Sequence, residues 1–230
     1  TRRRGRAEFV TVFTDHNNKR LREVAFGKTK DELKYQVANV EGRERVKNVT
    51  LDMSDSYRSF VREFFPNAEM IADKFHVLRL LTPAINKRRV QITGDKRKIP
   101  LRWLLLKPRY KLQYFERDAI DRWLLDYSEL KELYWAREAL FNFYRTKGFE
   151  RASRALTKLT DHLANSKIKE VRTLRRTLMA WRSEILNYFK TGLTNARTEG
   201  FNNKAKVVKR RAYGYKSFRN YRLKVLTACA

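Results

Sequence analysis

The sequence is poor in cysteine and has no long apolar run. Cys229 is its only cysteine, which excludes a disulfide framework or a cysteine zinc site within the chain and fits a reducing compartment. The longest apolar run, Trp103-Leu-Leu-Leu, lies between Arg102 and Lys107. It falls well short of the roughly 18 residues that a membrane-spanning helix needs. We therefore expect no membrane partner.

Acidic residues are scarce relative to basic ones. The 230 residues include 53 lysines and arginines but only 25 aspartates and glutamates, a formal net charge of +28. Because self-repulsion at such a charge destabilises a compact state, a polyanionic partner that releases counterions is the natural explanation. Aromatic residues make up 13% of the chain and hydrophobic residues 42%, which is too much for a disordered basic tail. The length allows one substantial core, or one core with an inserted subdomain.

The start of the chain carries the pattern of a hairpin. Residues 8–14 and 21–26 are rich in β-branched and aromatic side chains, and the turn Asp15-His-Asn-Asn separates them. This pattern predicts two antiparallel strands, with Asp15 as a turn residue and His16 on the surface. A short helix is expected over residues 30–41, before Gly42.

Two further strands are expected on either side of a helix. Residues 46–51 and 68–72 have strand composition, and apolar residues from Tyr57 to Phe65 recur at helical spacing until Pro66. Another helix is predicted over residues 75–92.

From Gly94 onwards the strand signals disappear. Residues 100–190 contain three or four helical stretches, among them 119–133 and 171–189, which predicts an all-α insertion. We place an α/β core in residues 1–93 and 193–230, with the insertion in residues 94–192. Four tryptophans are expected to form the core of the insertion: Trp103, Trp123, Trp135 and Trp181.

Two aspartates follow predicted strands directly. Asp52 and Asp73 each stand one residue after a strand, and parallel strands joined by a helix end at the same edge of a sheet. Carboxylates gathered at such an edge stay ionised at low cost only if cations bind between them, and two Mg²⁺ ions held there can act on a phosphodiester. On spacing alone, either aspartate could instead cap the helix that follows it.

A basic helix near the C-terminus carries one acidic residue. At 100° per residue, one of its stripes is apolar, formed by Phe201, Ala205, Val208 and Ala212. The opposite stripe holds Glu199, Asn202, Asn203, Lys206 and Arg210, with Arg211 beside it. A carboxylate among phosphate-binding groups suggests a metal ligand that faces nucleic acid. The alternative is a solvated basic face with one isolated glutamate.

Five segments in this order resemble the bacterial insertion-sequence transposases of the ISL-three type. They are residues 49–57, 65–68, 71–77, 195–204 and 211–215. The resemblance runs from about Arg3 to the C-terminus. It implies an α/β fold of the ribonuclease H-like type, with a mixed sheet, interrupted by the helical insertion. It also implies DNA strand cleavage and transfer at a DDE metal site, by a cut-and-paste or a replicative route.

The resemblance assigns roles to several residues. Asp52 looks like the second catalytic carboxylate and Glu199 like the third, while Asp73 either takes the second place or supports the site together with His76. The implied cofactor is Mg²⁺ or Mn²⁺, with two ions in the intact enzyme. The implied partner is double-stranded DNA, both transposon ends and target, and a homo-oligomer on DNA fits this function. The implied location is the bacterial cytoplasm, at the nucleoid.

The sequence also departs from the family pattern. The first aspartate of such enzymes lies just before the basic stretch seen here as Arg3-Arg4-Gly5-Arg6, and neither Glu8, Asp15 nor Asp31 stands in that place. The upstream zinc-binding and helix-turn-helix segments of the family are missing as well. We therefore expect a catalytic-domain fragment that binds DNA without cleaving it.

Three functions remain open at this stage. The leading one is a DDE transposase catalytic domain. The second is a non-catalytic, basic DNA-binding remnant of a transposase, and the third is a structure-specific DNA nuclease of the same fold. The Glu-Gly-Phe-Asn-Asn-Lys motif from Glu199 and the long helical insertion argue against the nuclease.

Overall fold

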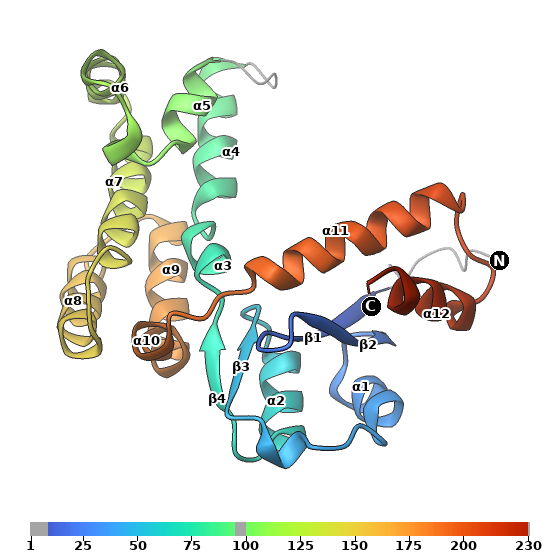
Figure 1. Cartoon of the computed structure of the whole chain (residues 1–230). Coiled ribbons are helices and arrows are strands. Elements are labelled where there is room, and N and C mark those ends of the chain that lie inside the picture. Colours follow the sequence, from blue (N-terminus) through green and yellow to red (C-terminus); the bar gives the residue numbers. More distant parts are fainter. Residues whose placement is uncertain (1–8, 95–99, 230) are drawn as a thin grey trace. The chain divides into compact units, whose positions relative to one another are not determined.

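The computed structural model describes residues 9–94 and 100–229 (Figure 1). Its secondary structure mixes helices with short strands and is mostly helical, which confirms the α/β class. The chain forms two compact units: the first comprises the residues up to Asp73 and from Leu193 onwards, and the second is Lys74–Gly192. The Arg3–Arg6 stretch and Glu8 lie outside the described residues.

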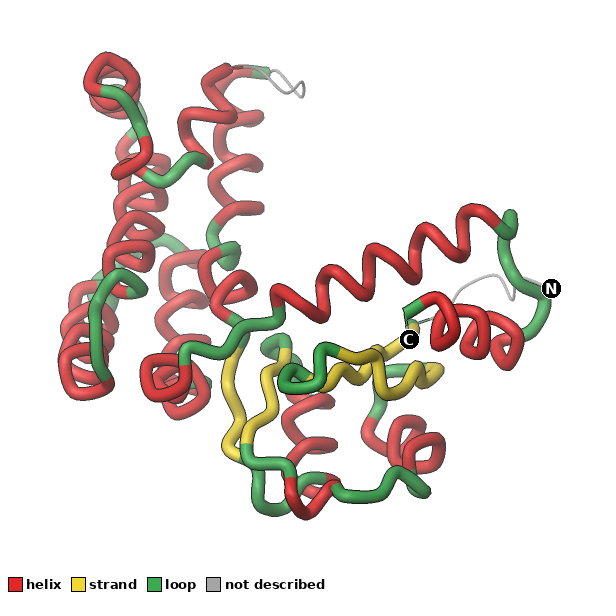
Figure 2. Tube along the Cα trace, viewed as in Figure 1, coloured by secondary structure: helices red, strands yellow, loops and turns green. Residues whose placement is uncertain are grey.

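The strands of the first unit pair as two separate two-stranded sheets (Figure 2, yellow). They are β1 (Val10–Asp15), β2 (Arg20–Phe26), β3 (Asn48–Leu51) and β4 (Glu69–Ala72). Strands β1 and β2 are antiparallel, so the predicted hairpin is confirmed. Strands β3 and β4 are parallel, with Leu51 opposite Ala72. The two C-terminal ends of β3 and β4 therefore lie side by side.

The hairpin turn is held by Asp15, as its sequence predicts. Asp15 Oδ1 accepts hydrogen bonds from the backbone nitrogens of Asn17 and Asn18, both at 3.0 Å, and Arg22 pairs with Oδ2 at 2.9 Å. These contacts, led by the backbone hydrogen bond from Asn18, hold the pKa of Asp15 well below its usual range. Asp15 thus acts as a local turn residue.

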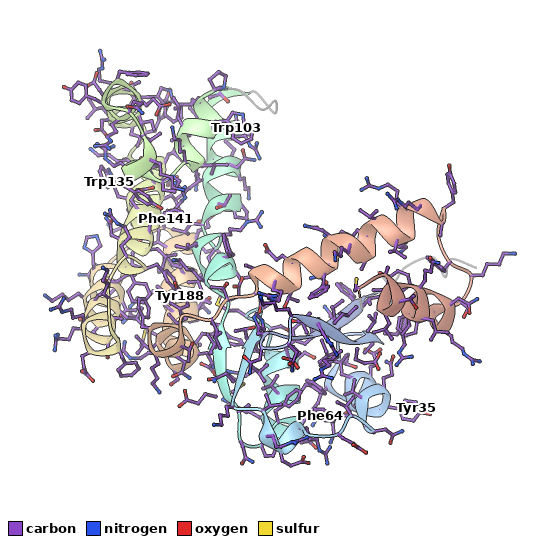
Figure 3. All side chains as sticks on the ribbon, in the orientation of Figure 1. Tyr35, Phe64, Trp103, Trp135, Phe141 and Tyr188 are labelled. Atoms are coloured by element: carbon purple, nitrogen blue, oxygen red, sulfur yellow. The ribbon has the colours of Figure 1, made fainter. Side chains whose placement is uncertain are left out.

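Helices α1 (Lys30–Val37) and α2 (Asp55–Phe64) pack together beside the hairpin. Thr29 and Glu32 form a capping box at the start of α1. The apolar face of α2 forms a cluster of buried residues with β2 and α1: Ala25, Leu33, Val37, Phe60, Val61 and Phe64. Phe64 lies within this cluster, whereas Tyr35 on α1 is exposed (Figure 3). A 3₁₀ turn, η1 (Arg43–Arg45), precedes β3.

Helix α11 (Ala196–Arg211) docks on the hairpin through the apolar stripe that the sequence predicts. Its buried contacts form the α11 cluster with β2 and with α12 (Phe218–Ala228): Leu21, Val24, Phe201, Ala205, Val225 and Cys229. Val208 packs against this cluster from its edge. Ala212, expected in the same stripe, is exposed because the helix ends at Arg211. The docking therefore lies on the N-terminal three turns of α11.

The second unit contains helices and no strand within its described residues. Its helices are α3 (Lys74–Leu78), α4 (Thr82–Thr93), α5 (Pro100–Leu106), α6 (Tyr114–Leu125), α7 (Ser128–Phe143), α8 (Phe149–His162), α9 (Lys169–Ala180) and α10 (Arg182–Thr191), with a 3₁₀ turn η2 (Arg109–Lys111). Helices α3 and α4 both pack on α7, so the contacts of this unit begin at Lys74, whereas the sequence-based division began at residue 94.

Three long helices expected from periodicity are each two helices. The expected helix 75–92 is interrupted between α3 and α4, where Pro83 stands in the first turn of α4 and favours a new start. The expected helix 119–133 is interrupted between α6 and α7, and the expected helix 171–189 changes direction at Trp181. Apolar residues keep helical spacing across these breaks, which is why periodicity missed them.

The expected tryptophan core of the second unit is wrong for two residues (Figure 3). Trp103 is 60% and Trp135 41% exposed, while Trp181 is buried. The guanidinium group of Arg109 lies 5.0 Å from the ring centre of Trp135, so a cation covers this ring. Aliphatic side chains fill much of the core instead, among them Leu105, Ile120, Leu124, Leu130, Leu133, Leu140, Leu156, Leu174 and Ile185.

A buried ion pair lies within this helical core. Arg137 Nη1 and Glu138 Oε1 are 3.1 Å apart, and Arg137 also donates to the carbonyl of Leu105 at 2.8 Å. Burial raises the pKa of Glu138 and lowers the pKa of Arg137. None of the helices in the described parts of the chain is long and apolar enough to cross a membrane.

Candidate metal centre

Two carboxylates lie side by side where β3 and β4 end. Asp52 follows β3 and Asp73 follows β4, and the Asp73 backbone nitrogen donates to the Leu51 carbonyl at 2.9 Å. The carboxylates of Asp52 and Asp73 each offer an oxygen within 4.8 Å of the other. Asp73 is fully buried and Asp52 half-buried. The parallel pairing thus places the two aspartates at one edge, as the sequence predicts.

Asn195 connects both aspartates to the start of α11. Its backbone nitrogen donates to Asp73 Oδ1 at 3.0 Å, and its side-chain nitrogen donates to Asp52 Oδ1 at 3.1 Å. Asn195 is only 8% exposed and stands at the N-cap position, but its side chain makes no capping bond. In the sequence, Asn195 has only the context of a helix cap, because contact with two distant aspartates leaves no local signal.

The end of β1 lies against the same start of α11. Thr14 Oγ1 and Thr198 Oγ1 are 2.7 Å apart, and α11 contacts β1. His16 Nε2 lies 3.4 Å from Thr50 Oγ1 on β3 and is half-buried, so its expected surface position is wrong. Burial, followed by repulsion from Arg197, lowers the pKa of His16. The hairpin turn therefore packs beside the strand that leads to Asp52.

Glu199 stands one helical turn beyond Asn195. Its backbone nitrogen donates to the Asn195 carbonyl at 2.9 Å, and its side chain is exposed. Among the described residues, Glu199 does not join Asp52 and Asp73 in a group whose possible ligand atoms all lie within 4.8 Å of one another. Convergence of Glu199 on the two aspartates stays a prediction. His76 is exposed in α3, three residues after Asp73, and belongs to the second unit.

The donor set at the two aspartates fits a divalent metal ion. Carboxylate and amide oxygens are the ligands that Mg²⁺ and Mn²⁺ prefer. The side-chain oxygen of Asn195 is buried and has no hydrogen-bond partner in the described structure. Two neighbouring carboxylates and an unsatisfied amide oxygen are an arrangement that a cation would stabilise.

The polar stripe of α11 faces away from the α11 cluster. Asn203, Lys206, Arg210 and Arg211 are exposed and Asn202 is half-buried. Within the described part of the chain, the structure shows no ion pair for Lys206, Arg210 or Arg211. Since no carboxylate of the described residues neutralises these cations, they are available to an external anion.

Acidic residues at strand ends, next to a helix with an exposed cationic face, are typical of proteins that act on nucleic acid with a divalent metal. The model of a transposase family, the ISL-three type of DDE transposases, matches residues 1–225. The chain therefore belongs to this transposase family.

Two relatives support the family. The transposase for insertion sequence element IS1001 of Bordetella parapertussis is 28% identical over 96% of this chain and 57% of its own length. The transposase for insertion sequence element IS1557 of Mycobacterium tuberculosis is 25% identical over 91% of this chain and 54% of its own length. The chain thus spans a little over half the length of these relatives. No solved structure matches it significantly.

Proposed function

We propose that the chain is the catalytic domain of a DDE transposase, an enzyme that cleaves and transfers DNA strands when an insertion sequence transposes. Its core is ribonuclease H-like, formed by residues 1–93 and 193–230, and residues 94–192 are the helical insertion. The observation that carries this proposal is the contact of Asn195 with both Asp52 and Asp73. This contact fixes the start of the helix that carries Glu199 at the edge where the two aspartates lie.

The proposed metal ligands are Asp52, Asp73 and Glu199, which hold Mg²⁺ or Mn²⁺. Held by these carboxylates, two such ions would supply activation of a water or a 3′-hydroxyl group and stabilisation of the leaving oxygen of a phosphodiester. Asp52 and Asp73 supply the fixed part of the site, because one follows β3 and the other β4. Glu199 is exposed on α11, one helical turn after Asn195, and is the third ligand in this proposal.

His76 supports this site in the proposal. It stands three positions after Asp73, and a chain of that length spans at most about 10 Å. Its imidazole is therefore within reach of Asp73 through the local chain alone. It either holds a hydrogen bond to a ligand carboxylate or binds the metal directly.

Double-stranded DNA is the proposed substrate, both as transposon ends and as target. Asn202, Asn203, Lys206, Arg210 and Arg211 bind it along the exposed stripe of α11. The exposed cations of that stripe support phosphate contacts that do not depend on base sequence. The protein works in the bacterial cytoplasm at the nucleoid, and it assembles on DNA as a homo-oligomer.

The second unit offers a further cationic surface to the same polyanion. An open cavity of about 670 Å³ is lined by Lys169, Arg172, Arg175 and Arg176, with Ala164 and Met179. Arg175 donates to the Thr160 carbonyl at 2.9 Å, which anchors this wall of the cavity. The buried face of α9, formed by Val171, Leu174 and Leu178, lies opposite Lys169, Arg172 and Arg176.

The test uses a supercoiled plasmid that carries the terminal sequences of the encoding insertion sequence. The product of the complete reading frame is incubated with it in Mg²⁺, as wild type and with Asp52→Asn or Glu199→Gln. We expect cleavage by the wild type and loss of cleavage by about 1,000-fold or more in each variant, with DNA binding retained. DNA binding without cleavage by the wild type would favour a non-catalytic remnant. Cleavage that survives Asp52→Asn would refute the assigned site.

A further inference from the structure

Asn195 makes two hydrogen bonds that together use both of its polar nitrogens. The backbone nitrogen donates to Asp73 at 3.0 Å and the side-chain nitrogen to Asp52 at 3.1 Å. These contacts join residues that lie 122 and 143 positions apart in the chain. A residue that served only as a helix cap would instead turn its side-chain oxygen to the free backbone nitrogens of the first helical turn.

The side-chain oxygen of Asn195 is left without a partner. Oδ1 is buried, and no hydrogen bond reaches it from the described residues. Such a buried acceptor is costly unless a donor, a water molecule or a cation binds it. Because Nδ2 is bonded to Asp52, the amide plane is fixed beside that carboxylate, and Oδ1 lies on the same amide group. Two acceptors so close together favour a cation between them.

We propose that Asn195 is a ligand of the metal ion held at Asp52 and Asp73, through its side-chain oxygen. This inference rests on the proposed metal centre and adds a residue to it. The amide supplies a neutral oxygen of the kind that hard divalent cations bind in addition to carboxylates. Its nitrogen meanwhile holds Asp52 in the orientation that the ion requires. The start of α11 and the metal site are thereby built from the same residue.

The substitution Asn195→Asp separates the ligand role from the donor role. Aspartate keeps the shape of the side chain and retains an oxygen, but it cannot donate a hydrogen bond to Asp52. If Asn195 binds the ion, the aspartate variant binds it at least as tightly as the wild type. If Asn195 only donates to Asp52, the aspartate variant repels that carboxylate and binds the ion as poorly as Asn195→Ala.

The experiment measures Mn²⁺ binding to the 230-residue chain, by electron paramagnetic resonance of the free ion and by the metal-induced rise in melting temperature. Three variants are compared with the wild type: Asn195→Ala, Asn195→Asp and Asn220→Ala. Asn220 is exposed on α12 and serves as the matched asparagine control. Circular dichroism spectra establish that each variant is folded.

We expect Asn195→Ala to weaken Mn²⁺ binding about 10-fold or more, and Asn220→Ala to leave it unchanged. We expect Asn195→Asp to lower the melting temperature of the metal-free chain and to show a larger metal-induced rise than the wild type. Wild-type affinity in folded Asn195→Ala, or affinity in Asn195→Asp as poor as in Asn195→Ala, would overturn the ligand role. Absence of Mn²⁺ binding in the wild type would instead refute the proposed metal centre.

Discussion

Truncation of Phe201 should release α11 from the hairpin and loosen the metal centre with it. Phe201 is 8% exposed and packs in the α11 cluster with Leu21, Val24 and Val225. Replacing such a buried ring by alanine lowers the free energy of unfolding by about 3–4 kcal/mol, because apolar burial is lost and a cavity is left behind. The free energy of unfolding falls by about 2 kcal/mol per molar urea. Phe201→Ala should therefore lower the urea concentration at the unfolding midpoint of the first unit by about 1.5–2 M.

The assay follows urea unfolding by circular dichroism, together with Mn²⁺ binding before unfolding begins. Val207→Ala is the matched control, because Val207 lies on the same helix and is 42% exposed. It should change stability by no more than about 0.5 kcal/mol. Since Asn195 begins the helix that Phe201 anchors, Phe201→Ala should also weaken Mn²⁺ binding. Equal unfolding midpoints for Phe201→Ala and Val207→Ala would refute the docking of α11.

Three further predictions concern charge. Lys206→Ala and Arg210→Ala should each weaken DNA binding equally on unrelated sequences, measured by fluorescence anisotropy. Each should also flatten the slope of log affinity against log salt concentration by about one unit. Loss of affinity on one sequence alone would contradict phosphate contact. The double variant Arg172→Ala, Arg176→Ala should flatten the same slope by about two units. An unchanged slope would show that α9 does not contact DNA phosphate. Because the folded pKa of Asp15 lies below its ordinary value of 3.8, its carboxylate stabilises the fold at neutral pH and this contribution is lost on acidification. Asp15→Asn should therefore lower the melting temperature more near pH 7 than near pH 2, and an equal loss at both would refute the role of its charge.

The placement of Asp52 and Asp73 could be predicted because its cause is local. Each aspartate follows a short strand, a helix separates the strands, and parallel pairing then brings the two strand ends to one edge. The docking face of α11 was predictable for the same reason, since Phe201 and Ala205 follow helical spacing. Strand composition and helical period are properties of neighbouring residues.

The contacts of Asn195 and His16 could not be predicted, because their partners are distant in the chain. Asn195 has the sequence context of a helix cap, and only the folded structure shows its side chain on Asp52. His16 lies in a polar turn, and only the approach of Thr50 and α11 half-buries it. Helix breaks such as that at Trp181 were missed because apolar spacing continues through them.

The most direct test of the account locates the metal on the polypeptide itself. Fe²⁺ is bound in place of Mg²⁺, and hydroxyl radicals generated with ascorbate and peroxide cleave the backbone close to the ion. We predict cleavage beside Asp52, beside Asp73 and at the start of α11 near Asn195, with suppression by excess Mg²⁺ and loss in the double variant Asp52→Asn, Asp73→Asn. Cleavage at other places, or a pattern that persists in the double variant, would contradict a metal centre at the ends of β3 and β4.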